Sequence, residues 1–308
     1  MRSEEMAHDH GSDHHHHHHA PADFGRAFMA GIILNSGFII LEVIFGIFSG
    51  SLALLADAGH NVADVLGLVL AWVASEMAKK AATKRRTYGW RRSTVVASLF
   101  NALLLLIGVG GIAWEAIMRI KDPTPVQGGT VIWVAALGIL VNGVSALFFL
   151  SGRKNDLNVR GAFLHMAADA AVSAGVMIAG AVIMFTDWRW LDSVVSLAVA
   201  FFILLSTWEL FRDSLNLSLD AVPESVDPDA VRNYLTNIPG IAEAHHIHIW
   251  PLSTTDVALT AHLVKKEPTL DNALLDRIRD ELHHDYGISH STIQFEAMDG
   301  GCDDKAHA

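Results

Sequence analysis

The sequence Ala56-Asp57-Ala58-Gly59-His60-Asn61-Val62-Ala63-Asp64 lies near the middle of an apolar segment that runs over residues 52–75. A segment of this length can cross the hydrocarbon core of a bilayer as a helix. Ionisable side chains are costly at that depth, so Asp57, His60 and Asp64 are interpreted as functional residues. His60 and Asp64 are four residues apart, and a helix therefore places both on one face, about one turn apart.

A second apolar segment repeats this spacing with His165 and Asp169. Two imidazoles and two carboxylates form an N2O2 donor set that suits a tetrahedral divalent cation such as zinc. The alternative is that each buried side chain only hydrogen-bonds a neighbouring helix. Because the pattern occurs twice, each time beside small residues that permit close helix approach, we favour one metal site formed by His60, Asp64, His165 and Asp169.

The composition indicates an integral membrane protein. The 308 residues are 51% hydrophobic, with a mean hydropathy of +0.33 and a formal charge of −11. Repeated apolar runs of about 20 residues exclude an ordinary soluble domain, and the acidic balance argues against nucleic-acid binding. A single cysteine, Cys302, excludes an intrachain disulfide and a cysteine-only metal cluster. No cleavable signal peptide is expected, because the first apolar run is too long for one.

Six segments are long enough to cross about 30 Å of hydrocarbon. They are residues 28–48, 52–76, 95–118, 130–151, 161–185 and 190–211. The connections after the second and fourth segments are rich in lysine and arginine, and the opposite connections contain few. By the positive-inside rule we expect both termini, and everything after residue 212, to be cytoplasmic.

Other polar side chains within these segments have two interpretations. Each either lines a cavity or joins helices, and helix joining is favoured for each one taken alone. They are Asn35, Glu42, Asn101, Asn142 and Ser145. Asp57 and Asn61 belong either to an ion route or to helix-orienting contacts. Asp192 and Glu209 lie near segment ends, and we assign them no role.

Residues 213–298 have the pattern of a soluble domain. Asp227-Pro228 is a typical helix start, and Pro239-Gly240 ends that helix. Strands are expected over 244–250, 257–264 and 291–297, with a second helix over 271–286. The predicted fold is therefore a polytopic α-helical membrane domain with six transmembrane helices, residues 26–212, plus a small cytoplasmic α+β domain of ferredoxin-like αββαβ order.

The two ends of the chain are predicted to be tails. Residues 1–25 contain His8, His10 and a run over 14–19. We interpret this segment as a disordered, metal-gathering cytoplasmic tail, with a purification tag as the alternative. Residues 299–308 are predicted to be a flexible C-terminal tail.

The predicted soluble domain is rich in histidine. Strand alternation places His262 on one polar face, and it places Gln294 and Glu296 together on the last strand. Such a face suits a second, more exposed metal site, with an ordinary hydrated sheet face as the alternative. In the first strand the same alternation selects His246 and His248 for this face.

Five stretches together carry a family resemblance. They are Ser51-Leu52-Ala53-Leu54-Leu55-Ala56-Asp57-Ala58-Gly59-His60-Asn61-Val62-Ala63-Asp64, Thr87-Tyr88-Gly89-Trp90, His165-Met166-Ala167-Ala168-Asp169, His246-Ile247-His248-Ile249-Trp250 and His290-Ser291-Thr292-Ile293-Gln294-Phe295. From about residue 24 to residue 296 the chain resembles the cation diffusion facilitator family, in its zinc, cobalt and cadmium efflux branch.

The resemblance implies a homodimeric secondary transporter of the bacterial inner membrane that exports divalent metal from the cytoplasm in exchange for protons. It implies the same four-residue transport site, and a histidine at the His60 position is associated with preferring zinc over cadmium. Zn2+ is the expected substrate, with Co2+ and Cd2+ also accepted, although nitrogen and oxygen donors alone leave the metal open among zinc, cobalt, cadmium and nickel.

For the cytoplasmic domain the resemblance implies a metallochaperone-like fold whose bound zinc tightens the dimer. It assigns the ligands to His245, His262 and Glu296, against the strand alternation noted above. It also suggests an ion pair between Arg92 and Asp220. Many family members carry a glutamate where Thr94 stands, and this sequence departs from that pattern.

Two other classes of function remain as alternatives. A membrane-embedded metalloenzyme needs an open coordination position and commonly has His-Glu-x-x-His spacing, which is absent from the sequence, so no enzymatic activity is expected. A membrane-anchored metal sensor does not need ionisable residues in the middle of two spans.

Overall fold

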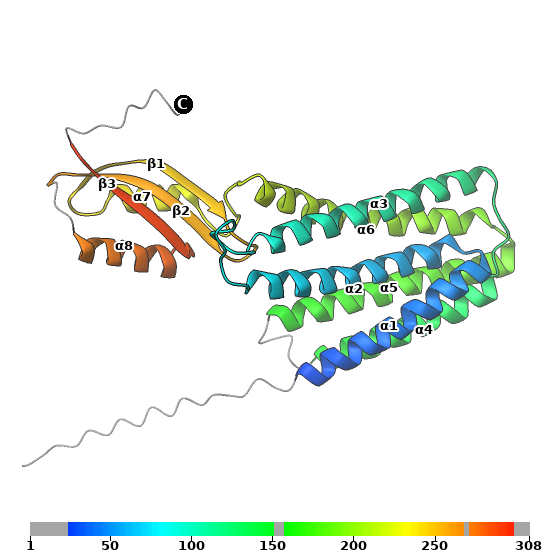
Figure 1. Ribbon diagram of the computed structural model, residues 1–308. Helices are drawn as coiled ribbons and strands as arrows, with labels where there is room; N and C mark the ends of the chain where they lie inside the picture. Colours follow the sequence, from blue (N-terminus) through cyan, green and yellow to red (C-terminus); the bar gives the residue numbers. More distant parts are fainter. Residues whose placement is uncertain (1–23, 151–156, 268–270, 299–308) are drawn as a thin grey trace, which may run out of the picture.

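The computed structural model describes residues 24–150, 157–267 and 271–298, which form a long helix bundle with a small α+β domain at one end (Figure 1). We call the bundle end that carries this domain the near end and the opposite end the far end. The histidine run of the predicted N-terminal tail and the predicted C-terminal tail with Cys302 lie outside the described residues.

The bundle confirms the predicted membrane domain. Its helices are α1 (Phe24–Ser49), α2 (Leu52–Ala78), α3 (Ser93–Lys121), α4 (Gly128–Phe149), α5 (Leu157–Thr186) and α6 (Trp190–Ser218). Within the described residues, α2 to α6 are long and apolar enough to cross a membrane, and α1 adds a shorter apolar stretch over Leu34–Ser49. Large apolar side chains such as Trp133 and Phe185 point outward, as expected in lipid.

The helices pack as two groups joined by α2. One group is α3 with α6, and the other contains α1, α4 and α5, with α4 packed along α5 (Figure 1). Helix α2 packs on α1, α3 and α6, whereas its contact with α5 is short. Helix α6 continues to Ser218, beyond the boundary predicted at residue 212.

The start of α2 is fixed by a buried carboxylate from α6. Asp192 accepts hydrogen bonds from the Ser51 hydroxyl at 2.5 Å and from the backbone N–H of Leu52 at 2.7 Å. This capping satisfies amide groups that a helix N-terminus leaves unpaired. The preceding Gly50 has φ +71°, and a Cβ there would lie 2.8 Å from the Pro125 carbonyl oxygen. Asp192 therefore has a structural role. The interpretation from the sequence, that its position near the end of a segment gives it no role, is wrong.

The C-terminal domain has the predicted αββαβ order. Its elements are α7 (Pro228–Thr236), β1 (Ile241–Pro251), β2 (Val257–Lys265), α8 (Asn272–His284) and β3 (His290–Ala297). The sheet order is β1-β2-β3, with β1 antiparallel and β3 parallel to β2. Asp227 caps α7 and Asp271 caps α8 through side-chain bonds to backbone N–H groups. Both helices bury aliphatic side chains against the sheet, Val231 and Leu235 from α7 and Leu274, Ile278 and Leu282 from α8.

A bulge in β1 corrects the predicted alternation. His245 pairs with His262, and His248 pairs with Thr260, so the two residues between them oppose one residue of β2. His246 is one of these two and has φ +49°. Such a bulge shifts the phase of a strand by one residue. His245 and His248 therefore share the polar face, and the alternation that selected His246 fails at this point.

Candidate metal centres

Helices α2 and α5 bring the two His-x-x-x-Asp pairs together. The His60 Nε2 atom lies 3.6 Å from Asp64 Oδ2 and 3.8 Å from Asp169 Oδ1. The His165 Nε2 atom lies 3.2 Å from Asp64 Oδ2 and 3.6 Å from Asp169 Oδ2. Each imidazole therefore approaches both carboxylates, its own and that of the other helix.

These separations suit one ion. Ligand atoms bound at about 2.0 Å around a tetrahedral zinc ion are roughly 3.3 Å apart. Candidate ligand atoms of His60, His165 and Asp169 all lie within 4.8 Å of one another, and Asp64 contacts both histidines. The four side chains predicted from the sequence thus form one compact N2O2 group.

The site opens toward the near end of the bundle. The exposed fraction of the side chain rises from 5% for Asp169 and 17% for His60 to 32% for Asp64 and 42% for His165. Toward the far end α2 is buried over residues 52–54 and 56–58. There Ser173 of α5 donates a hydrogen bond of 3.2 Å to Asp57 of α2 and joins the two helices. In each helix the more exposed ligand, Asp64 or His165, therefore lies toward the C-terminal domain, and contacts between the helices lie on the opposite side.

Other polar side chains of the bundle lie outside the four-residue metal site. The Asn61 amide donates to Glu42 Oε2 at 3.3 Å, which joins α2 to α1. Asn35 contacts Met166 of α5. Asn142 and Ser145 are buried in α4. For Asn35 and Glu42 these contacts match the predicted role in joining helices.

The second group lies on the sheet of the C-terminal domain. Glu296 of β3 lies 3.2 Å from His245 Nε2 and 2.7 Å from His262 Nδ1 through its two carboxylate oxygens. Gln294 of β3, which pairs with His262 of β2, donates its amide to Glu296 Oε1 at 2.9 Å. The bulge described above brings His245 into this group, as the family resemblance implies and as simple alternation does not.

The donor set of this second group fits a divalent cation. Candidate ligand atoms of the three side chains lie within 4.8 Å of one another. Among the described residues, His245 Nε2, His262 Nδ1 and Glu296 Oε2 are buried, and their short contacts with one another do not have the geometry of hydrogen bonds. Unsatisfied buried nitrogen and oxygen atoms are costly, and a zinc ion would satisfy all three.

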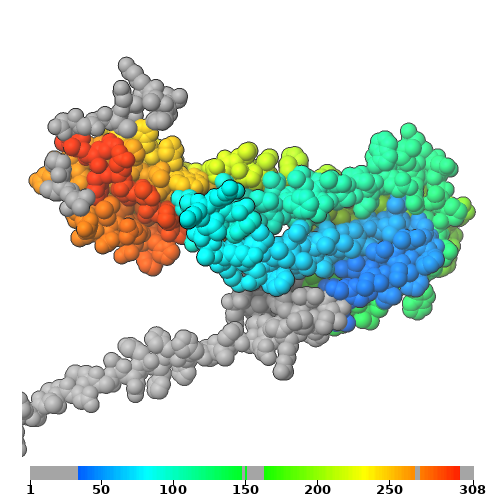
Figure 2. Space-filling view, viewed as in Figure 1, coloured from blue at the N-terminus to red at the C-terminus, as the bar shows by residue number. Residues whose placement is uncertain are grey.

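The helix bundle contacts the C-terminal domain through the connection between α2 and α3, which lies against that domain (Figure 2). Arg92 forms an ion pair of 2.5 Å with Asp220, as the resemblance suggests. Arg91 forms another, of 3.3 Å, with Asp256 in the turn between β1 and β2, and sequence reasoning did not identify this pair. A cavity of about 510 Å³ lies beside this junction, and Asn101 lines it.

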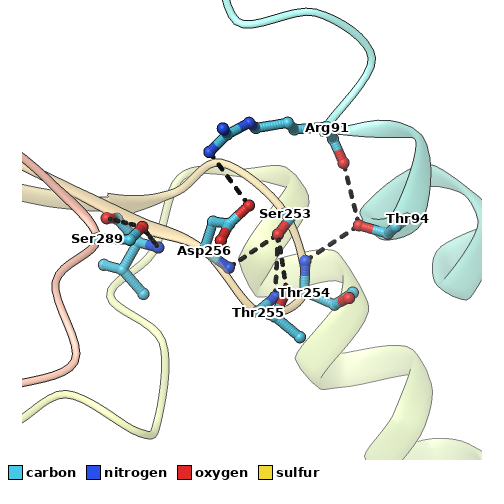
Figure 3. A network of polar contacts seen from close by, with 8 residues as sticks. Arg91, Thr94, Ser253, Thr254, Thr255, Asp256 and Ser289 are labelled. Atoms are coloured by element: carbon cyan, nitrogen blue, oxygen red, sulfur yellow. Dashed lines mark hydrogen bonds and ion pairs between the residues drawn. The ribbon is translucent and has the colours of Figure 1, made fainter. Parts of the chain in front are cut away.

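Thr94 belongs to the same junction (Figure 3). Its hydroxyl accepts a hydrogen bond from the backbone N–H of Thr254 at 3.1 Å and donates to the carbonyl oxygen of Arg91. The Thr254 N–H group lies in the turn between β1 and β2, whereas Thr94 lies in the first turn of α3. The residue that departs from the family pattern thus has a local structural role here.

Comparison with known proteins gives two family matches and several full-length relatives. Residues 28–217 match the cation efflux transmembrane domain, and residues 223–298 match the cation efflux protein, cytoplasmic domain. The zinc transporter ZitB of Escherichia coli is 38% identical over 293 residues, which cover 94% of this chain and 93% of ZitB. The metal cation efflux system protein CzcD of Cupriavidus metallidurans is 36% identical, over 94% of this chain and 90% of CzcD. A cadmium, cobalt and zinc/H(+)-K(+) antiporter of Bacillus subtilis is 33% identical, over 88% of each chain.

Proposed function

The chain belongs to the cation efflux family, and we propose that it is a secondary transporter that exports zinc, and also cobalt and cadmium, in exchange for protons. The observation that carries this proposal is the convergence of His60, Asp64, His165 and Asp169 from two membrane helices. ZitB is named as a zinc transporter and CzcD as a metal cation efflux system protein, and the Bacillus subtilis relative is named as a cadmium, cobalt and zinc/H(+)-K(+) antiporter. They support a transporter and not an enzyme.

Charge accounting supports the exchange. Two carboxylates and two neutral imidazoles neutralise a dication, whereas the same site without metal carries a charge of −2 in a medium of low dielectric constant. Histidine titrates near neutral pH, so His60 and His165 are suited to take up protons when the metal leaves. Metal and protons then compete for the same side chains.

Alternating access follows from the geometry of α2 and α5. The two helices are joined through Asp57 and Ser173 on the far side of the site, and the site is more accessible on the near side. We infer that metal enters from the near side and that a rocking movement of the helices opens the far side. No covalent step is required.

We further propose that the near side is the cytoplasmic side of a bacterial inner membrane, with both termini in the cytoplasm. The basic connection between α2 and α3 lies at this end, in agreement with the positive-inside rule. His245, His262 and Glu296 would bind a zinc ion there, and two copies of the chain would pair through their C-terminal domains. A ligand that binds the folded dimer stabilises it by mass action.

Transport in reconstituted vesicles tests the main proposal. Purified protein in proteoliposomes is supplied with zinc, cobalt, cadmium or nickel, with and without a pH gradient. We expect zinc accumulation driven by the gradient, and we expect Asp64→Ala and His165→Ala each to abolish it. His283→Ala, at an exposed histidine of α8, is the matched control. Transport that survives either ligand substitution would rule out the shared site.

A further inference from the structure

Glu42 of α1 and Asp57 of α2 form a pair of buried acids beside the metal ligands. Their exposed fractions are 0% and 2%. Asn61, one helical turn after Asp57 on α2, donates a hydrogen bond to Glu42, so the two acids are neighbours where α1 packs on α2. Asp57 precedes His60 by three residues, so the pair lies about one helical turn closer to the far end than the metal site. Neither acid belongs to the four-residue metal site.

The hydrogen bonds around this pair are incomplete. Glu42 Oε2 accepts from Asn61 at 3.3 Å, and Asp57 Oδ2 accepts from Ser173 at 3.2 Å. The other oxygen of each acid, Glu42 Oε1 and Asp57 Oδ1, is buried and has no donor among the described residues. Two ionised carboxylates at this distance repel each other strongly in a low-dielectric interior. One proton held between them removes a charge and supplies the missing donor.

Among the side chains that the structure describes, no lysine or arginine interacts with the pair. The other ionisable groups that interact with the pair are His60 and Asp169, and both belong to the metal site. The sequence of α4 contains no ionisable residue. In α3 and α6, Arg119 bonds Glu115 and the Gly50 carbonyl at the far end, and Asp192 caps α2 there.

Asp192 is a buried acid whose two carboxylate oxygens both have hydrogen-bond donors. It is 2% exposed, and its oxygens accept from the Ser51 hydroxyl and from the N–H groups of Leu52 and Ala53. Charge-assisted bonds of this kind at a helix N-terminus stabilise the ionised form. The Glu42–Asp57 pair has no comparable set of donors.

We propose that Glu42 and Asp57 together form a proton-binding site, separate from the metal ligands, that releases its proton when a dication enters the adjacent metal site. The proposal rests on the proposed metal–proton exchange. A +2 charge one helical turn away stabilises a second negative charge on the pair, so the proton leaves to the water that reaches the metal site. When the metal departs, the pair takes up a proton again. Metal and proton therefore bind antagonistically through different side chains.

Glu42→Gln and Asp57→Asn test this site. Each amide has the shape of a protonated acid but cannot release a proton, and having two variants guards against one that fails to fold. Protons released on binding saturating zinc are measured in weakly buffered detergent solution. We expect the release to fall by about one proton per zinc in either variant. In proteoliposomes at equal pH, exchange of external for internal zinc should persist, whereas accumulation driven by a pH gradient should fall, because only the protons of His60 and His165 remain coupled to zinc.

Glu209→Gln is the matched control, because it makes the same acid-to-amide change at an exposed residue of α6. Its proton release should equal that of the unmodified protein. Unchanged release in Glu42→Gln and Asp57→Asn would overturn the proton site, and so would a joint loss of zinc binding and zinc exchange. If the unmodified protein itself shows no gradient-driven accumulation, the proposed transport function fails instead.

Discussion

The two candidate metal centres have similar donors but are built in different ways. In the membrane, two helices each supply a histidine and an aspartate four residues apart, and the site lies between them. In the C-terminal domain, three strands each supply one ligand, and a bulge sets the position of the first. A site between helices can open and close as the helices rock, whereas a site on one hydrogen-bonded sheet is held rigidly. The difference supports the proposal that the first site transports the metal and that the second serves regulation or stability.

Asp169→Ala should distinguish the functions of the two sites most clearly. The substitution removes a buried carboxylate that contacts both membrane histidines. We expect gradient-driven zinc transport to be abolished while bound zinc falls by about one ion per chain and not to zero, because the C-terminal ligands remain. Zinc transport in proteoliposomes and metal analysis of the purified protein measure both effects. Loss of all bound zinc would contradict the independence of the two sites.

The reverse experiment is His262→Ala. It removes the central histidine of the C-terminal group, so we expect part of the zinc-dependent thermal stabilisation to disappear. A ligand at 100 times its Kd stabilises a protein by about 2.7 kcal/mol, which sets the scale of the loss. Transport should continue at a reduced rate. Thermal unfolding with and without zinc measures the effect, and His284→Ala, at an exposed histidine of α8, is the control.

The bulge itself can be tested at His246, whose φ of +49° is unfavourable for a branched side chain. His246→Val should disfavour the bulge by about 1–2 kcal/mol and displace His245 from the metal-binding face. We expect zinc affinity at the C-terminal site to fall by roughly tenfold. His246→Gly keeps the backbone conformation available and is the comparison. Titration of zinc into the Asp169→Ala background isolates this site, and equal affinities in the two variants would contradict the role of the bulge.

These two sites also differ in how much the sequence reveals. A helix has a regular period, so the four-residue spacing of His60 and Asp64 is enough to place both on one face. Burial of charge then identifies them as functional. A strand is regular only until a bulge interrupts it, and alternation alone therefore selected His246 in place of His245. The resemblance to a family supplied that ligand because it carries information about tertiary structure.

Contacts between distant segments were the least predictable. The cap that Asp192 gives to α2 joins residues 140 positions apart, and no local pattern indicates it. The pair of Arg91 and Asp256 is equally remote in sequence. Glu42 was visible as a polar residue in an apolar span, but its contact with Asp57 depends on how α1 packs against α2. Side-chain type predicted that some of these residues have a role, but the contacts that they make depend on how the helices and domains pack.

The smallest expected effect concerns the link between the two parts of the molecule. Arg92 and Asp220 form an ion pair whose side chains are 47% and 53% exposed, so solvent screens it and its contribution to stability is about 0–1 kcal/mol. Arg92→Asp should lower the transport rate slightly by placing two like charges together, and the double variant with Asp220→Arg should restore it, because only the direction of the pair is reversed. Lys80→Asp changes the charge of the same basic connection at an exposed residue and serves as the control. If the double variant is no better than the single one, the pair does not couple the C-terminal domain to α3, and the coupling must then pass through Arg91 and Thr94.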